Sequence, residues 1–315
     1  MANASVSPSV RGRFAPSPTG RLHAGNVFSY LVAYIVAHRA GGTIALRIED
    51  LDPQRSKPEF AQACLRDLDY LGLGWDVGPL YQSTRTEAYR QAFHDLVDRG
   101  LVYPCFCSRA DVHAASAPHR GEKFVYAGTC RNLTEDERAS RMRHLQAQGR
   151  SPSMRLIVPD RTYEIDDLFQ GRYAQNSAVD CGDFLICRSD GAFAYQLAVV
   201  VDDAAQGVTS VVRGVDLLSS SPQQAYLQDL LGFERVSYGH VPLLVSRTDR
   251  RLSKRDHDAS IDQMRATYGS AAGILGHIAF VAGMVPEDGP ATVDELVAHA
   301  DLSSLSGCIQ KVWKA

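Results

Sequence analysis

A histidine within a run rich in proline and glycine could bind phosphate near the start of the chain. Residues 13–26 have the sequence RFAPSPTGRLHAGN. Pro16 and Pro18 exclude a helix from the middle of this run, because proline lacks an amide N–H and biases the preceding residue towards extended geometry. Apolar residues then repeat at helical spacing over residues 28–36. A strand, a stiff loop and a helix N-terminus in this order direct backbone N–H groups at a ligand, usually phosphate.

Two groups of side chains suit a nucleoside triphosphate. The imidazole of His23 can donate to a phosphate oxygen, and Gly25 lets a flat group approach the backbone. Much later, residues 251–255 have the sequence RLSKR. A flexible cationic loop there can close over a triphosphate, with Lys254 following the charge as it builds. Taken alone, such a charged run is more often a solvated surface.

Other polar residues could hold a small zwitterion with a second carboxylate. Arg13, and Arg213 at the end of a predicted strand over residues 210–213, could each grip a carboxylate in bidentate fashion. Glu49, at the carboxyl end of another predicted strand, could pair with an ammonium group. Tyr195 could donate its hydroxyl, although it could equally be a core residue, and Arg213 could belong to a structural ion pair.

Three cysteines are spaced for a metal site. Cys105, Cys107 and Cys130 could meet through a short hairpin. Zinc prefers four ligands, so the fourth would come from Tyr126, His113, His119 or water. The alternative is that these cysteines are buried small hydrophobes. The remaining cysteines lack such spacing and are predicted to lie in the core: Cys64, Cys181, Cys187 and Cys308.

The elements that must position these residues follow an α/β pattern. Residues 43–50 predict a strand after the first helix, giving a right-handed βαβ unit, and residues 60–71 predict the next helix. Capping boxes are expected at Thr84, Thr134 and Thr292, each followed by Glu three positions later. Further strands are predicted at residues 154–158, 183–188, 193–201 and 240–245, and a helix at 222–231, with the apolar run 199–203 as a central parallel strand.

The chain is divided into four parts by this pattern. Residues 11–100 form the first half of a catalytic domain. The residue pattern changes over residues 101–160, which form an insertion with the cysteines. Residues 161–258 form the second half and end in the charged loop. Residues 259–315 form a short helical C-terminal region.

Composition narrows the class of protein. The 315 residues are 45% hydrophobic and 22% charged, as in an ordinary soluble globular protein. The net charge of −3 means that an RNA partner would need a local basic face. Seven cysteines without an export signal or a membrane-spanning run favour a reducing cytoplasm.

The two phosphate-binding runs together resemble the class I aminoacyl-tRNA synthetases, in particular the glutamyl branch. Residues 23–26 (HAGN) stand in place of the family's His-Ile-Gly-His tetrad, and residues 251–255 in place of its mobile Lys-Met-Ser-Lys-Ser loop. Asn26 and Arg251 depart from the family pattern but keep a hydrogen-bonding group and a charge. The resemblance implies an α/β fold with a Rossmann-like doubly wound parallel sheet.

The resemblance also implies a reaction and its residues. A carboxylate attacks the α-phosphate of ATP, which brings Mg²⁺, while His23 and Lys254 act as catalytic residues that stabilise the transition state. The glutamate site would consist of Arg13, Ala15, Ser17, Glu49, Tyr195 and Arg213. The ATP site would consist of Pro16, His23, Gly25, Asn26, Arg251, Ser253 and Lys254. Asp202 and Asp203 would be scaffold, one of them orienting Arg213.

The cysteine spacing resembles that of the short glutamyl-synthetase paralogues. There the resemblance implies one structural Zn²⁺ held by Cys105, Cys107, Tyr126 and Cys130. Only residues 255–315 follow Lys254, whereas a full glutamyl-tRNA synthetase continues into anticodon-binding domains. The chain therefore resembles the glutamyl-queuosine tRNA(Asp) synthetase family, which activates L-glutamate and transfers it to queuosine in the anticodon of tRNA(Asp).

Acceptor and assembly are the least determined features. Arg141, Arg143, His144 and Arg150 are candidates for contacts with tRNA phosphates. A ligase that joins glutamate to a small amine would use the same active site, and a catalytically inactive RNA-binding regulator is a further alternative. We expect a monomer without a membrane partner.

Overall fold

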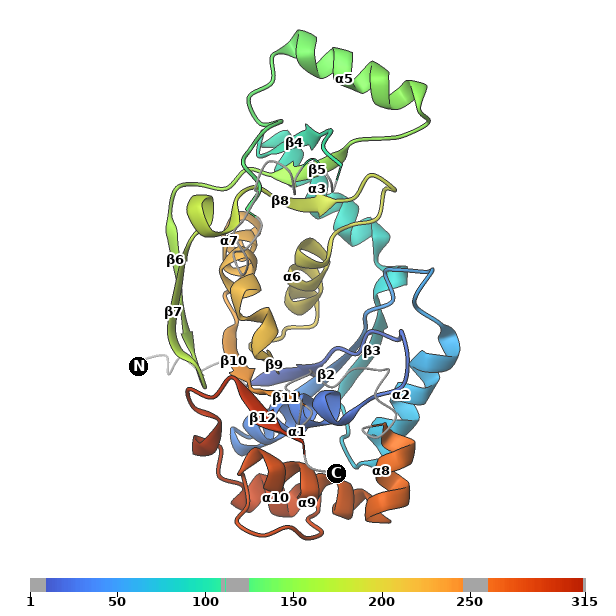
Figure 1. The fold of residues 1–315 in the computed structure, drawn as a ribbon, viewed down its shortest axis with the longest axis vertical. Helices are drawn as coiled ribbons and strands as arrows, with labels where there is room; N and C mark the ends of the chain where they lie inside the picture. Colours follow the sequence, from blue (N-terminus) through green and yellow to red (C-terminus); the bar gives the residue numbers. More distant parts are fainter. Residues whose placement is uncertain (1–9, 109–110, 112–124, 246–259, 314–315) are drawn as a thin grey trace, which may run out of the picture.

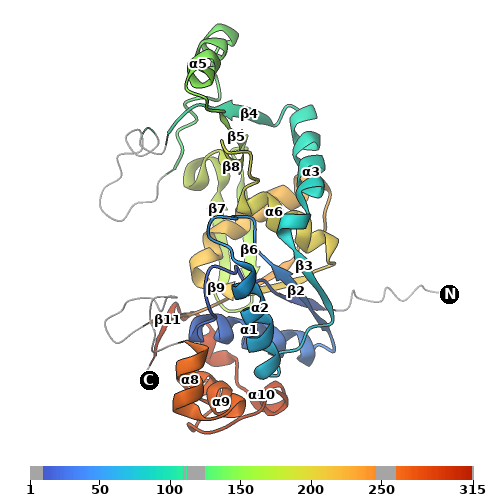
Figure 2. The same cartoon turned by 90° about the vertical axis from the view of Figure 1, so that its right-hand side faces the viewer.

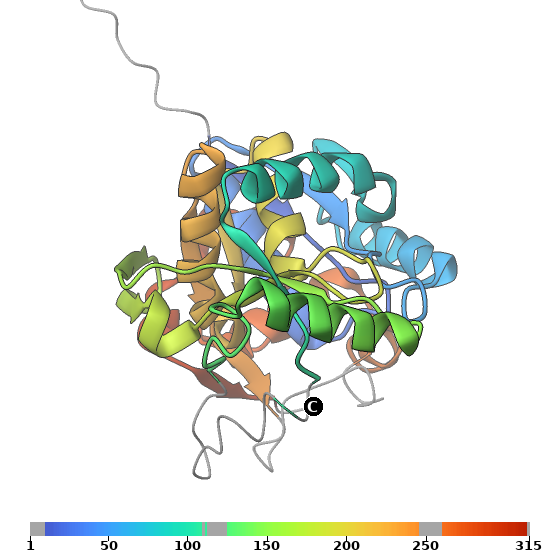
Figure 3. The same ribbon diagram turned by 90° about the horizontal axis from the view of Figure 1, so that it is seen from above.

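The computed structural model describes residues 10–108, 111, 125–245 and 260–313. The molecule is elongated, with helix α5 (Glu135–Ala147) at one end of the long axis (Figure 1). Helices α8 (Ile261–Tyr268), α9 (Ala271–Ala282) and α10 (Val293–His299) lie at the other end, and a view turned by 90° agrees (Figure 2). Seen along the long axis, α5 crosses the front of the molecule (Figure 3). Within the described part of the chain, no helix has the length and apolar character that a membrane crossing requires.

Parallel strands form the centre of the molecule. Strand β1 (Arg11–Phe14) pairs with β2 (Thr43–Ile48), which pairs with β3 (Val77–Tyr81). Strand β9 (Ser210–Gly214) pairs in parallel with β10 (Ser237–Val241). The two groups meet where the backbone N–H of Thr209 donates to the carbonyl of Arg11 at 3.0 Å. The predicted α/β class with parallel sheets is confirmed.

The second sheet continues beyond β10. Strand β6 (Thr162–Asp167) pairs in parallel with β10 and antiparallel with β7 (Gly171–Asn176). A separate antiparallel sheet joins β4 (Val102–Cys105), β5 (Ser153–Leu156) and β8 (Phe184–Cys187). Strands β11 (Leu243–Val245) and β12 (Gln310–Val312) form a parallel pair near the C-terminal end.

Helices cover both faces of the central strands. Helix α1 (Ala24–Arg39) packs in one core with Phe14, residues of α2 (Pro58–Tyr70), and helices α9 and α10. Helices α3 (Thr86–Asp98), α6 (Tyr195–Ala205) and α7 (Ser221–Leu231) form the other core. In Figure 1, α6 and α7 lie on the opposite side of the strands from α1. Short helical turns cover Gln82–Thr84, Ser177–Cys181, Val215–Ser220 and Ser303–Leu305.

The prediction of a strand over residues 193–201, with 199–203 as a central strand, is wrong. This segment is helix α6, and Val199, Val200 and Val201 are buried between α3, α7 and the sheet. The residues from Leu197 to Asp203 are all buried, so this part of the helix lacks the exposed polar face that marks a surface helix. The run of valines therefore carried no periodic signal.

Two further expectations need correction. The predicted capping box at Thr84 is wrong, because α3 begins at Thr86 and the Thr84 hydroxyl instead donates to the carbonyl of Tyr81. The capping boxes at Thr134 and Thr292 are confirmed. The single strand expected over residues 240–245 is two strands, β10 and β11, separated at Pro242, which has no N–H for a ladder hydrogen bond.

The four-part division of the chain stays a prediction. Strand β8, from the predicted second half of the catalytic domain, pairs with β5 of the predicted insertion. Helix α5 extends from that insertion, and the side chains of Arg141, Arg143, His144 and Arg150 are exposed on it or just after it.

Candidate active site and metal centre

A cavity of about 510 Å³ opens at the carboxyl ends of β1, β2 and β9. Ligands of open α/β sheets bind at this edge, where the loops that follow the strands meet. Every residue predicted for the glutamate and ATP sites that the structure describes lines the cavity. These residues are Arg13, Ala15, Pro16, Ser17, His23, Gly25, Asn26, Glu49, Tyr195 and Arg213.

The N-terminus of α1 forms one wall. His23 is the N-cap residue with extended backbone, and Asn26 accepts a hydrogen bond from the backbone N–H of His23 through Oδ1 at 3.2 Å. A Cβ atom at Gly25 would lie 3.1 Å from Cε1 of His23. The flat group that approaches the Gly25 backbone is therefore the His23 imidazole itself, and Asn26 fixes the turn that positions it.

A buried network of charges holds the opposite wall. Asp203 on α6 accepts from Nη1 of Arg47 at 2.7 Å, and Nε of Arg13 lies 3.0 Å from the same oxygen. Arg47 also donates to Glu49 at 3.3 Å. Burial by itself lowers the pKa of Arg47, but the charges of Asp203 and Glu49 outweigh it, and the net shift is upward. Asp203 therefore keeps Arg13 and Glu49 in place at the cavity.

The expectation that Asp202 or Asp203 orients Arg213 is wrong. Asp202 points to the other side of α6, where it accepts from Gln82 at 3.0 Å and from Tyr89 at 2.6 Å. Consecutive residues of a helix lie about 100° apart around its axis, so the two carboxylates face different neighbours. Asp203 forms ion pairs with the arginines of strands β1 and β2, whereas Asp202 links α6 to α3.

Arg213 is nearly buried at the end of β9 with its guanidinium at the cavity. Its shortest hydrogen bonds go to Ser221 Oγ at 2.8 Å and Gln224 Oε1 at 2.9 Å. The Tyr195 hydroxyl lies 3.5 Å from Nη1, at the first residue of α6. Tyr195 thus lines the cavity, and Arg213 donates to a serine hydroxyl and a glutamine amide; their roles in binding a substrate stay predictions.

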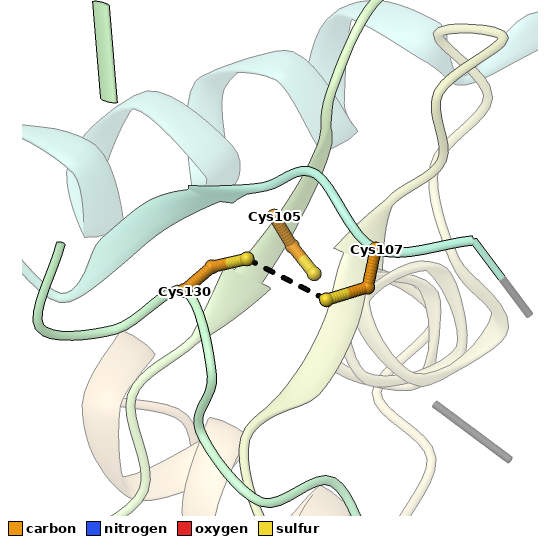
Figure 4. Close-up of side chains that lie close together, drawn as sticks. All are labelled: Cys105, Cys107 and Cys130. Atoms are coloured by element: carbon orange, nitrogen blue, oxygen red, sulfur yellow. Dashed lines mark hydrogen bonds between the residues drawn. The ribbon is translucent and has the colours of Figure 1, made fainter. Parts of the chain in front are cut away.

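The three cysteines predicted to bind a metal lie together at the end of β4, whose last residue is Cys105 (Figure 4). Their sulfur atoms all lie within 4.8 Å of one another, and Cys107 and Cys130 are 3.6 Å apart. A tetrahedral zinc ion with Zn–S bonds of about 2.3 Å separates its sulfurs by roughly 3.8 Å, so the geometry suits zinc. The other four cysteines lie elsewhere, and of these Cys64 is buried while Cys181, Cys187 and Cys308 are only half-buried.

Tyr126 reaches the same cluster. Its hydroxyl lies 3.5 Å from the Cys105 sulfur and 4.0 Å from that of Cys107. The guanidinium of Arg155 stacks on the Tyr126 ring at 3.7 Å and donates to the Cys105 sulfur at 3.2 Å. A hydrogen bond from Cys130, together with those from Tyr126 and Arg155, outweighs burial and lowers the pKa of Cys105 to about 4. A thiolate is the form that binds metal.

Some predicted residues lie outside the described part of the chain. These are Arg251, Ser253 and Lys254 of the charged loop, and His113 and His119 as alternative zinc ligands. Ser260 is the first described residue after the charged loop, and it forms an isolated antiparallel bridge with His23. The first described residue after the loop is thus paired with the N-cap residue of α1.

A family model described as "tRNA synthetases class I (E and Q), catalytic domain" matches residues 9–295. The chain belongs to this class I tRNA synthetase family. Glutamyl-Q tRNA(Asp) synthetase from Nitratidesulfovibrio vulgaris is 44% identical over 94% of this chain and 93% of its own length. The enzyme of that name from Symbiobacterium thermophilum is also 44% identical, over 93% of each chain.

Solved structures of class I synthetases agree. A glutamate tRNA ligase from Elizabethkingia meningosepticum, in complex with its amino acid, superimposes with a TM-score of 0.79 at 25% identity. The match covers 98% of this chain and 67% of that one. The predicted relationship to the glutamyl branch of the class I synthetases is confirmed.

Sequence reasoning missed some residues that organise this synthetase pocket. Arg47 and His240 are fully buried polar side chains within apolar strands, and neither was expected near the site. Arg55 and Asp216 also line the cavity. A charged residue inside an apolar strand is costly unless it is paired, and this signal could have identified Arg47.

Proposed function

We propose that the chain activates L-glutamate with ATP as glutamyl-adenylate and transfers the glutamyl group to queuosine in the anticodon of tRNA(Asp). The observation that carries the proposal is the convergence of Arg13, Arg213 and Glu49 with the N-terminus of α1 in one cavity. The names of relatives that are 44% identical over 93% or more of this chain support the acceptor. The enzyme is then a ligase of the class I synthetase type.

The charges of the cavity suit glutamate. Arg213 supplies a buried cation for the side-chain carboxylate, and the Tyr195 hydroxyl at 3.5 Å from it can donate to the same group. Glu49 can form an ion pair with the α-ammonium group of glutamate. Arg13, Ala15 and Ser17 complete this side of the pocket in the proposal. Arg13 and Glu49 both belong to the network of Asp203, so they are fixed before the substrate arrives.

Activation is an in-line substitution at phosphorus. An α-carboxylate oxygen of glutamate bonds to the α-phosphorus of ATP, and the bond from that phosphorus to the bridging oxygen breaks, releasing pyrophosphate. The helix N-terminus with His23, Gly25 and Asn26, beside Pro16, offers donors to the phosphates. Lys254 and Arg251 neutralise the charge that develops, and the Ser253 hydroxyl can donate a hydrogen bond to the phosphates. Mg²⁺ enters with the triphosphate.

Transfer completes the reaction. A hydroxyl oxygen of the cyclopentenediol ring of queuosine attacks the carbonyl carbon of the adenylate, and AMP leaves with the electron pair of the broken bond. An anticodon base must leave its stack to reach the cavity, as in other enzymes that act on single bases. Exposed Arg141 and Arg143 on α5 are candidates for phosphate contacts.

The cysteine cluster is proposed to hold one structural Zn²⁺ with Tyr126 as fourth ligand. Three sulfurs within 4.8 Å support three of the ligands. The Tyr126 hydroxyl also accepts from the backbone N–H of Cys130 at 2.9 Å, which orients its oxygen towards the sulfurs. The ion would tie β4 to the segment around Cys130.

The test is transfer of labelled glutamate to tRNA(Asp) with and without queuosine, alongside tRNA(Glu). We expect label only on the queuosine form. Charging of tRNA(Glu) would contradict the proposed acceptor. Glutamate-dependent ATP–pyrophosphate exchange without labelled RNA would favour a ligase acting on a small amine. Absence of exchange would favour an inactive RNA-binding regulator.

A further inference from the structure

Every N–H group of the Arg213 guanidinium has a partner within hydrogen-bond distance. Arginine has five such donors. The contacts not yet described run from Nε to His240 Nε2 at 3.1 Å and from Nη2 to the Leu217 carbonyl at 3.3 Å. The donor–acceptor distances fall into two groups. They are 3.1 Å or less to Ser221, Gln224 and His240, and 3.3 Å or more to Tyr195 and Leu217. A substrate carboxylate can replace the longer contacts while the shorter ones hold the group.

His240 lies between Arg213 and a buried carboxylate. It is the register partner of Arg213 across the parallel pair β9–β10, so both side chains share one face of the sheet. On its other side, Nδ1 of His240 forms a short hydrogen bond with Asp167 Oδ2. Both side chains of this second pair are fully buried.

These contacts determine the tautomer of His240. Arg213 Nε can only donate, so the facing Nε2 of His240 must accept with its lone pair. The proton then resides on Nδ1 and is donated to the Asp167 carboxylate. A neutral imidazole is required, because an imidazolium would present an N–H to the Arg213 cation. Burial, aided by the charge of Arg213, lowers the pKa of His240 despite the opposing effects of Asp167 and Asp216.

Asp167 is held rigidly at the end of β6. Its Oδ1 accepts from the backbone N–H groups of Phe169 at 3.0 Å, Gln170 at 2.9 Å and His240 at 3.0 Å. Burial would raise the pKa of Asp167, but the hydrogen bonds from His240 and Gln170 outweigh it and lower the pKa. The carboxylate therefore stays charged and provides a fixed acceptor for His240 Nδ1.

We propose that His240, fixed in one tautomer by Asp167, is a positioning residue that aims Arg213 at the side-chain carboxylate of the substrate and so sets the preference for glutamate over glutamine. This inference rests on the proposed function. This contact ties Nε of Arg213 to the sheet, and the longer contacts of its two terminal nitrogens go to Tyr195 and Leu217, which both line the cavity. Without the contact at Nε the guanidinium would be held only by Ser221 and Gln224, and a shift of its plane would weaken the bidentate geometry that distinguishes a carboxylate from an amide.

Two variants separate the two nitrogens of the imidazole. In His240→Asn the amide can replace Nδ1 towards Asp167, but no atom reaches the position of Nε2. In His240→Gln the amide oxygen can reach that position and accept from Arg213. The measurements are glutamate-dependent ATP–pyrophosphate exchange with KM for glutamate and for ATP, kcat/KM for glutamate relative to glutamine, and the melting temperature.

The expected result is a split between the two substrates. His240→Asn raises KM for glutamate about 10- to 100-fold, the range for a lost hydrogen bond to a charged group, and lowers the glutamate preference by a similar factor. KM for ATP should stay within about threefold, because only glutamate contacts Arg213 in the proposal. A merely structural defect would instead raise KM for both substrates alike. His240→Gln recovers most of the glutamate affinity.

Two outcomes would overturn the inference in distinguishable ways. If the wild-type enzyme exchanges with glutamate and His240→Asn leaves its glutamate KM and preference unchanged, the positioning role is wrong while the proposed function stands. If the wild-type enzyme shows no glutamate-dependent exchange, the proposed function fails and this inference fails with it. Should His240→Gln not fold, His240→Asn alone still decides.

Discussion

Arg47 and Asp203 form a buried ion pair of 2.7 Å across 156 positions of the chain. The same carboxylate oxygen lies 3.0 Å from Nε of Arg13. One side chain on α6 therefore compensates cations on β2 and β1, directly beneath the cavity. Two buried guanidinium groups would repel each other without it, and the strands that carry them could not pack at this distance.

Asp203→Asn should destabilise the protein by about 3–5 kcal/mol, since it leaves two buried cations without their shared anion. The urea midpoint should fall, and KM for glutamate should rise as Arg13 and Glu49 lose their positions. Asp229→Asn is the matched control, because Asp229 pairs with Arg235 at a half-exposed position where the loss should be less than about 1 kcal/mol. Equal effects of the two substitutions would contradict the assigned role.

Gly25→Ala should lower kcat about 10- to 100-fold without loss of stability. The new Cβ atom would lie 3.1 Å from the His23 ring and displace it from the position proposed for it beside the phosphates. Alanine also favours a helix over glycine by about 1 kcal/mol, so the melting temperature should stay the same or rise. Gly74→Ala, where a Cβ meets nothing within 4 Å, is the control. Unchanged kcat in the Gly25 variant would show that the imidazole position is unimportant.

Cys107→Ser should abolish stoichiometric zinc binding, measured as zinc per chain by mass spectrometry of the purified protein. Cys187→Ser, at a half-buried cysteine outside the cluster, should retain one zinc. Tyr126→Phe should bind zinc more weakly than the wild type, shown by faster loss to a chelator. If the Tyr126 variant lost zinc to the chelator at the wild-type rate, Tyr126 would not be the fourth ligand.

Stability should decrease as the pH falls below about 6.5, partly because of His240. Its pKa is lowered in the folded state by burial and by Arg213, against Asp167 on β6 and Asp216 after β9. The unfolded chain then binds a proton at this histidine at higher pH than the folded chain, so acid favours unfolding. Titration of His240 lowers the free energy of unfolding by at most about 1.4 kcal/mol per pH unit as the pH falls. Above about pH 7.5 it adds no pH dependence to the stability.

His240→Gln removes this titration and isolates its effect. The unfolding free energy from urea titrations at pH 7.5 and 5.5 should fall less in the variant than in the wild type. Groups that do not contact His240 titrate equally in both proteins and cancel in the comparison, whereas Asp167 loses a hydrogen bond that lowers its pKa. A wild-type protein that loses no more stability than the variant would mean that His240 does not titrate with a lowered pKa.

Local signals in the sequence predicted much of the fold and the site. The capping boxes at Thr134 and Thr292 and the β1–α1 run with His23 and Gly25 depend on neighbours a few residues away, so the sequence contains them completely. The helix α6 was missed for the opposite reason. Its valines are buried on all sides, and burial depends on elements that are distant in the chain.

The sequence by itself determined the residue types of the pocket, which are an arginine before the Pro-rich loop, a histidine at a helix N-terminus and a second arginine after a strand, and it determined the three cysteines with metal spacing outside the pocket. Only the tertiary structure decided which groups hold these residues. Asp203 serves Arg13 and Arg47 rather than Arg213, and Arg213 instead depends on His240 and Asp167. Such pairings depend on how α6, β6, β9 and β10 pack, because side chains meet across elements and no local spacing specifies which ones.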